Sequence, residues 1–411
     1  MIKFAAPPRR KQKNRLDYID GIRGIASVLV VLCHLACVFY PSFYRLNDSP
    51  STFERIYLLS PLNVITNGNS AVQCFFTLSG FLIARKFYLR KESAITSPLK
   101  LYVKLLKVIF PAVTLAFLLM FSGAMFHLDA ARINDTLSFL NDYNNFKPTV
   151  KSLINDAFFR TYIEYSVYVG PLWTIRTEFI GSLMISAVSY YASSKRNLSK
   201  LIYIVFGIAY LFYNPIFCGF IAGAFAFDCV YNSKDNTDKT NEVFLFPFRN
   251  KIIRFSTFIV GVYLFSTGFT LDGLYKPLGF LPDVLSGNLG VIRATGCAIC
   301  LLCVEFSHTA KTALSIKPIR WIGSISAYTY AFHWPIILSA GCGIYILLNK
   351  YYSYGVLFIF ILLVVFVITF SLAWGYTKFN PFIDRTINLV FDRIKLLYSN
   401  CKTRMLTNKN S

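Results

Sequence analysis

Charged residues are scarce in this chain of 411 residues. Asp, Glu, Lys and Arg together make up 15% of the sequence, whereas hydrophobic residues make up 55% and the mean hydropathy is +0.50. Soluble domains carry about 25% charged residues, so the composition excludes a soluble globular protein. Segments 321–348 and 353–376 instead supply the roughly 20 apolar residues with which a helix crosses a bilayer.

Acidic residues are scarcer than basic ones. The chain has 20 Asp and Glu against 42 Lys and Arg, which gives a net charge of +22. In a soluble protein this excess would suggest a nucleic-acid partner. Here the basic residues form short clusters beside apolar runs, the pattern of cytosolic loops in membrane proteins. The charge therefore predicts orientation in a bilayer, and no nucleic-acid partner is expected.

Cysteine is missing from the three longer segments that we expect outside the membrane, 41–68, 127–167 and 271–287. This absence excludes a disulfide-stapled ectodomain. Cys297, Cys300 and Cys303 have a spacing similar to that of cluster ligands. Inside an apolar helix, however, the spacing favours small packing residues, and no metal is expected.

The sequence also lacks internal repeats, low-complexity tracts and any segment large enough for a soluble domain. These features predict an all-α integral membrane protein of about ten transmembrane helices. With a cytosolic N-terminus, the inside segments hold 31 basic residues and the outside segments hold 8, so both termini are predicted to be cytosolic. The predicted spans are 21–40, 69–88, 105–126, 168–190, 200–213, 214–232, 252–269, 288–306, 321–348 and 353–376.

Three regions are predicted along the chain. Residues 1–20 form a cytosolic basic arm, 21–376 the transmembrane domain and 377–411 a cytosolic tail. In the tail, apolar residues from Ile383 to Leu397 recur at helical spacing beside basic residues. This pattern favours an amphipathic helix on the inner leaflet, and a disordered basic tail is the alternative.

Ionisable residues inside spans are costly and usually face a cavity. Arg23 and His34 are eleven positions apart, which is three helical turns plus about 20°, so both project from one helix face at heights about 16 Å apart. A cation near the cytosolic boundary suits an anion-headed donor, and an imidazole deeper in the membrane suits proton abstraction. An intramembrane His that only hydrogen-bonds between helices is the alternative.

Four motifs resemble, in order, those of the acyltransferase-3 family of integral membrane O-acyltransferases. The first, RLDYIDGIRGIASVLVVLCH, contains the family's Arg, ten residues and a His as Arg23 and His34. The others are similar to the family's second-span, Trp–Glu and late His-Trp-Pro motifs, and together they cover most of the chain. They read FFTLSGFLI at 75–83, LWTIRTEF at 172–179 and YTYAFHWPI at 328–336.

The resemblance implies a ten-span core, an acyl-CoA donor at the cytosolic face and a hydroxylated acceptor presented from the other side. It also implies that Arg23 and His34 are essential, with His34 as general base and an acyl-His intermediate as the less favoured variant. At the start of the third span, where members often carry Arg, this chain has Lys104 and Lys107, which keep the charge but lose the bidentate fork.

Further candidate residues each have a structural alternative. Asp20 orients the Arg23 guanidinium in a donor site or caps the helix start. Ser79 and Gly80 let the donor approach closely or serve helix packing. The remaining candidates are Trp173 as a cavity wall, Glu178 as a catalytic residue that orients His34 or as a partner of an intramembrane Arg, His333 as a cavity or structural residue, and Arg293 as a donor-site cation or the partner of an acidic group.

The predicted function is transfer of an acyl group, acetyl by family habit, from acyl-CoA to a hydroxyl of a carbohydrate, lipid or secondary metabolite. No bound cofactor is expected, because acyl-CoA is a co-substrate. The alternatives are a proton- or anion-coupled transporter and a non-catalytic scaffold. The expected location is an endomembrane or the plasma membrane if the host is eukaryotic.

Overall fold

The protein is helical throughout the ranges described by the computed structural model, which are 16–44, 51–90, 96–231 and 245–385. These ranges contain no β-strand, so the prediction of an all-α protein is confirmed. Residues 1–15 of the predicted basic arm and 386–411, which hold most of the predicted tail helix, lie outside them.

Four stretches of helix are long and apolar enough to cross a membrane. A fifth is counted if α14 (Leu289–Glu305) and α15 (His308–Leu314), which meet at 104°, form one broken span. This number is smaller than the ten predicted from the sequence. The four are α1 (Asp17–Phe39), Pro98–Phe121 within α4 (Thr96–Phe121), Lys317–Leu348 across α16 (Lys317–Ile336) and α17 (Cys342–Leu348), and Tyr354–Arg385, which begins with α18 (Tyr354–Thr377).

Helix length and polarity account for the difference. Each predicted span contains a helix, but α9 (Ser199–Tyr213), α10 (Cys218–Tyr231) and α12 (Lys251–Phe265) have only 15, 14 and 15 residues. At 1.5 Å per residue such helices are about 22 Å long, shorter than the ~30 Å apolar layer of a bilayer. The helices α3 (Gly68–Arg90) and α8 (Trp173–Ser194) are long enough but more polar.

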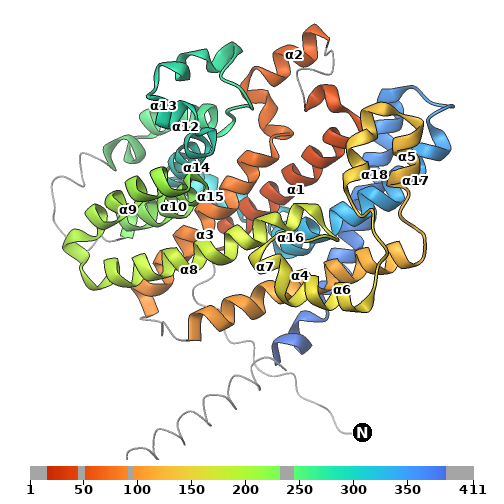
Figure 1. Cartoon of the computed structure of the whole chain (residues 1–411). Helices are drawn as coiled ribbons and strands as arrows, with labels where there is room; N and C mark the ends of the chain where they lie inside the picture. The colour runs from red at the N-terminus through yellow and green to blue at the C-terminus, as the bar shows by residue number, and fades with distance from the viewer. Residues whose placement is uncertain (1–15, 45–50, 91–95, 232–244, 386–411) are drawn as a thin grey trace, which may run out of the picture.

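The helices α1 and α16 pack directly against each other near the middle of the molecule (Figure 1). They run parallel, because Gly24 faces Gly323 and His34 faces His333, ten residues further along both helices. A Cβ atom on Gly24 would lie 2.7 Å from the backbone nitrogen of Gly323, so the absence of side chains permits this close approach. The parallel register brings the first motif and the last motif of the sequence together.

The second central contact joins α3 to α10. A Cβ atom on Gly80 would lie 1.9 Å from the carbonyl oxygen of Phe220, so Gly80 serves close helix packing. The helices α9, α12 and α14 lie on the same side of the molecule as α10, and α18 lies on the opposite side (Figure 1).

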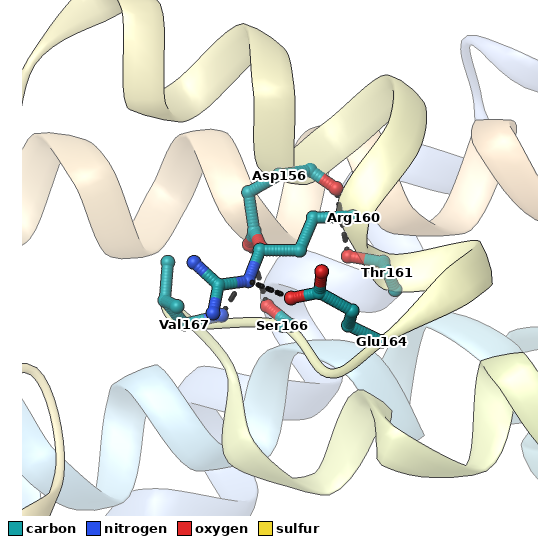
Figure 2. A network of polar contacts seen from close by, with 6 residues as sticks. All are labelled: Asp156, Arg160, Thr161, Glu164, Ser166 and Val167. Carbon is teal, nitrogen blue, oxygen red and sulfur yellow. Dashed lines mark hydrogen bonds and ion pairs between the residues drawn. The ribbon is translucent and has the colours of Figure 1, made fainter.

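Short helical pieces form the segment between α4 and α8, and a buried carboxyl group fixes its end (Figure 2). Asp156 accepts hydrogen bonds from the Ser166 hydroxyl at 2.6 Å and the Val167 amide at 3.0 Å. Its own carbonyl accepts one from Thr161 at 2.8 Å. Burial raises the pKa of the Asp156 carboxyl despite these donors. The network holds the chain that leads into α8.

Two of the three cysteines of α14, Cys300 and Cys303, lie against α12. The Cys303 thiol is 3.6 Å from the carbonyl oxygen of Arg254, and a Cβ atom on Gly261 would lie 2.8 Å from the Cys300 sulfur. These contacts agree with the predicted packing role of the cysteine spacing. Within the described ranges, no group of three or more His, Cys, Asp or Glu side chains has an arrangement that could hold a metal ion.

Candidate active site

Two histidines from opposite ends of the sequence form the centre of the site. His34 Nδ1 lies 2.9 Å from the Val30 carbonyl oxygen and 3.2 Å from His333 Nε2. His333 Nδ1 lies 2.6 Å from the Tyr330 carbonyl oxygen. A carbonyl oxygen only accepts hydrogen bonds, so both Nδ1 atoms carry the proton. The single Nδ1–H of His34 is then shared between the Val30 carbonyl oxygen and the lone pair of His333 Nε2.

This assignment leaves one basic nitrogen unused. In neutral His34 the lone pair is on Nε2, which makes no hydrogen bond to any described residue, and the side chain is only partly buried. His333 is fully buried. A hydrogen bond at Nδ1 fixes both the tautomer and the orientation of an imidazole. His34 Nε2 therefore presents a pre-oriented base.

Aromatic rings hold the His34 side chain in place. The Trp334 ring meets it edge-on with centroids 5.3 Å apart, and the His333 ring lies at 4.9 Å. The Tyr143 ring, from the segment between α4 and α8, packs against Trp334 at 5.1 Å. We refer to His34, His333, Trp334 and Tyr143 as the histidine cluster. Its rings restrict movement of the base.

A cavity of about 180 Å³ lies between α1, α3, α4, α8 and α16. It gathers Arg23, Ser79 and Glu178, which three of the family motifs contribute, and Lys104 from the start of the third predicted span. We call this space the donor cavity. Its other lining residues are Val72, Phe75, Phe76, Leu105, Val108, Thr174, Ile175, Ser326, Ala327 and Tyr330.

Positively charged side chains outnumber negatively charged ones in the donor cavity. Glu178 accepts hydrogen bonds from Ser79 at 2.6 Å and Ser182 at 3.3 Å, and it interacts electrostatically with Lys104 and Arg23. Arg23 makes no ion pair within 4.0 Å among the described residues. Two cations and one carboxylate leave an excess of positive charge, so the cavity suits an anionic ligand.

Tyr330 joins the donor cavity to the histidine cluster. Its ring lines the cavity, and its carbonyl oxygen holds His333 one helical turn further along α16. Its hydroxyl donates to the carbonyl oxygen of Pro171 at 2.6 Å and lies 2.5 Å from the Thr174 hydroxyl. The cavity thus ends one turn from the histidine pair.

His34 and His333, which form the histidine cluster, do not line the donor cavity, and neither do four of the other predicted site residues. Gly80 faces α10, as described above. Trp173 precedes two lining residues and packs against the core. Asp20 lies in the first turn of α1 and is not its N-cap, because the helix begins at Asp17 after Leu16. Glu178 lines the cavity but has no contact with His34 among the described residues.

Arg293 also lies apart from the donor cavity. Its guanidinium donates to the carbonyl oxygens of Thr267, at 2.8 Å, and Gly268, just after the end of α12. The described residues provide no carboxylate partner for it. Arg293 thus lies outside the lining of the donor cavity and forms no ion pair with a described carboxylate. Arg293 instead holds the chain just after α12, and its charge lies near the negative end of that helix, which a cation stabilises.

Sequence reasoning missed the Tyr330 connection and the Tyr143 contact. His333 and His34 are 299 positions apart, and no periodicity in the sequence pairs them. The available signal was the motif at 328–336, which contains Tyr330, His333 and Trp334 together. Tyr143 carries no motif, so only the path of the chain between α4 and α8 brings it to the site.

Comparison with known proteins defines the class of the protein. The family model of the acyltransferase-3 proteins, described as an acyltransferase domain, matches residues 16–378. The chain therefore belongs to this family, and the protein is an integral membrane acyltransferase. No curated protein and no solved structure matches the chain.

Proposed function

We propose that the protein transfers an acyl group, in the first instance acetyl, from cytosolic acyl-CoA to a hydroxyl on a carbohydrate, lipid or secondary metabolite. The observation that carries this proposal is the alignment of a cationic cavity with a free imidazole nitrogen along α1 and α16. Arg23 lines the cavity, and His34 stands three turns further along the same helix.

In this proposal the donor binds by its charge. Arg23 and Lys104 hold phosphate oxygens of acyl-CoA, because guanidinium and ammonium groups form strong charge-assisted hydrogen bonds to phosphate. Glu178 and Ser79 position these cations. The apolar wall, which includes Phe75 and Val108, accommodates the long arm that leads to the thioester.

The proposed reaction uses His34 as general base. Its Nε2 takes the proton of the acceptor hydroxyl while the hydroxyl oxygen forms a bond to the thioester carbonyl carbon. The carbon–sulfur bond then breaks, and the departing thiolate takes the proton back. The Val30 carbonyl oxygen and His333 Nε2 share the Nδ1–H of His34 throughout, and both stabilise the transient imidazolium.

The proposed topology has about ten spans with both termini in the cytosol. Two observations support it. The charge asymmetry places Arg23 near the cytosolic end of α1, and the parallel course of α1 and α16 fits their positions as first and ninth spans. Labelling of single cysteines introduced at positions 13 and 276 tests it. The label should reach position 276 in intact cells and position 13 only after permeabilisation, and the reverse pattern would contradict it.

Release of free CoA from acetyl-CoA by the purified protein tests the proposed activity. The protein is supplied with an extract of surface glycans and lipids as acceptor. His34→Ala should abolish release, whereas His308→Ala, which changes an exposed histidine away from the histidine cluster, should retain it. No acetyl-CoA-dependent release by the unaltered protein, or equal release by His34→Ala, would contradict the proposal. Mass spectrometry of surface glycans and lipids from cells with and without the chain identifies the acceptor.

A further inference from the structure

The indole N–H of Trp334 is buried without a hydrogen-bond acceptor. The side chain is 2% exposed, and Nε1 has no partner among the described residues. A buried donor left unpaired costs about 1–3 kcal/mol, and tryptophan usually pairs its N–H when buried. An unpaired donor next to a candidate base therefore calls for a ligand that supplies the acceptor.

The surroundings fix the position of this N–H. Trp334 packs edge-on against His34 and against Tyr143. A Cβ atom on Gly170 would lie 3.6 Å from Trp334 Nε1 and 2.8 Å from Tyr143 Cε1, so Gly170 keeps side-chain atoms away from the donor. The adjacent Pro171 is fixed by the hydroxyl of Tyr330. The N–H is thus preorganised at the edge of the histidine cluster.

The proposed reaction offers two oxygen atoms that the Trp334 N–H could bind, the acceptor hydroxyl oxygen and the thioester carbonyl oxygen. The acceptor hydroxyl oxygen needs its lone pair for attack, and a hydrogen bond from an N–H donor would weaken it as a nucleophile. The thioester carbonyl oxygen, in contrast, gains a negative charge during attack. A fixed donor in a water-poor site stabilises such a charge far more than it stabilises the ground state.

We propose that the Trp334 N–H donates a hydrogen bond to the acyl carbonyl oxygen and to the oxyanion that it becomes. This inference rests on the proposed acyl transfer. As the acceptor oxygen bonds to the carbonyl carbon, the carbonyl π electrons move onto the oxygen beside Trp334, and His34 Nε2 takes the hydroxyl proton. The electrons return when the carbon–sulfur bond breaks, and the thiolate leaves with that proton.

Removal of the N–H with minimal change of shape tests this assignment. Replacement of Trp334 by 3-benzothienylalanine, in which sulfur takes the place of the N–H, should lower kcat about 10²–10³-fold. The KM for acetyl-CoA should change less than twofold, because the lost interaction forms in the transition state. Trp334→Phe should show the same loss of kcat. Trp321→Phe is the matched control, since Trp321 lies on the same helix and is 42% exposed.

The outcomes separate this inference from the proposed function. If the unaltered protein and His34→Ala behave as proposed but the benzothienylalanine protein retains full kcat, Trp334 is not an oxyanion donor. If the unaltered protein transfers no acyl group, the proposed function itself fails. Thermal unfolding in detergent shows whether a loss reflects folding: a folded benzothienylalanine protein with an unchanged kcat overturns the assignment, even if Trp334→Phe does not fold.

Discussion

The donor cavity and the histidine cluster lie along the same two helices but differ in their chemistry. The cavity contains charged groups, Arg23, Lys104 and Glu178, whereas the cluster consists of rings around His34. Charge suits the binding of an anionic donor, and a neutral imidazole suits proton abstraction. The difference indicates that the donor cavity binds the substrate and the histidine cluster, further along α1 and α16, carries out the proton transfer.

Loss of charge in the cavity should produce the largest effect on donor binding. Arg23→Gln should raise the KM for acetyl-CoA about 10–100-fold, because a charged hydrogen bond contributes about 1.5–3 kcal/mol. The kcat at saturation should change much less. Arg23→Lys keeps the charge but loses the bidentate hydrogen bonding of a guanidinium. Its KM should lie between those of the unaltered protein and Arg23→Gln. Steady-state kinetics measure both constants, and an unchanged KM in Arg23→Gln would remove Arg23 from the donor site.

Substitutions of His333 should affect the histidine cluster and therefore kcat. His333→Leu removes one of the two acceptors for His34 Nδ1–H, the other being the Val30 carbonyl oxygen, and should lower kcat about 10–100-fold, as for other residues that orient a functional imidazole. His333→Gln provides a carbonyl oxygen near the position of Nε2 and should recover part of the loss. A pH profile of kcat distinguishes positioning from folding, since His333→Leu should shift the profile of His34. If Leu and Gln have equal effects, the proposed hydrogen bond has no role.

Arg293 is a buried cation outside both the donor cavity and the histidine cluster, so its replacement tests whether donor binding needs a cation in the cavity. Arg293→Gln should leave the KM for acetyl-CoA unchanged and lower thermal stability, since the carbonyl oxygens of Thr267 and Gly268 lose their donor. A rise in KM comparable with that of Arg23→Gln would instead bring Arg293 into donor binding.

His127 should produce the smallest effect, on stability alone. Burial lowers its pKa, although its Nε2 hydrogen-bonds to the Tyr143 carbonyl and Asp129 lies nearby. A lowered pKa means that the folded protein favours neutral His127, so stability is lost as the pH falls below about 6.5. His127→Gln should lessen this loss between neutral and acidic pH. Thermal unfolding across that range measures it, and identical pH dependence in both proteins would contradict the burial argument.

Local patterns in the sequence predicted part of this arrangement. Hydropathy identified the helices, and Arg23 and His34 lie on one helix because eleven residues make nearly three whole turns. By length and polarity, four or five helices qualify as spans instead of the ten predicted, since apolar runs such as 200–213 form helices of only 15 residues. The pairing of His34 with His333 depends on the glycine contact between α1 and α16, which connects residues about 300 positions apart. The contacts of Arg293 with the carbonyl oxygens of Thr267 and Gly268 likewise depend on where α12 ends.

A structure of the protein with a hydrolysis-resistant acetyl-CoA analogue tests the central claim most directly. The analogue's phosphates should contact Arg23 and Lys104, and its carbonyl carbon should lie beside His34, with room for a hydroxyl oxygen within about 3–3.5 Å of both that carbon and Nε2. An analogue that binds away from Arg23, or a His34 Nε2 that faces the lipid and cannot be reached from the thioester, would contradict the proposed acyl transfer.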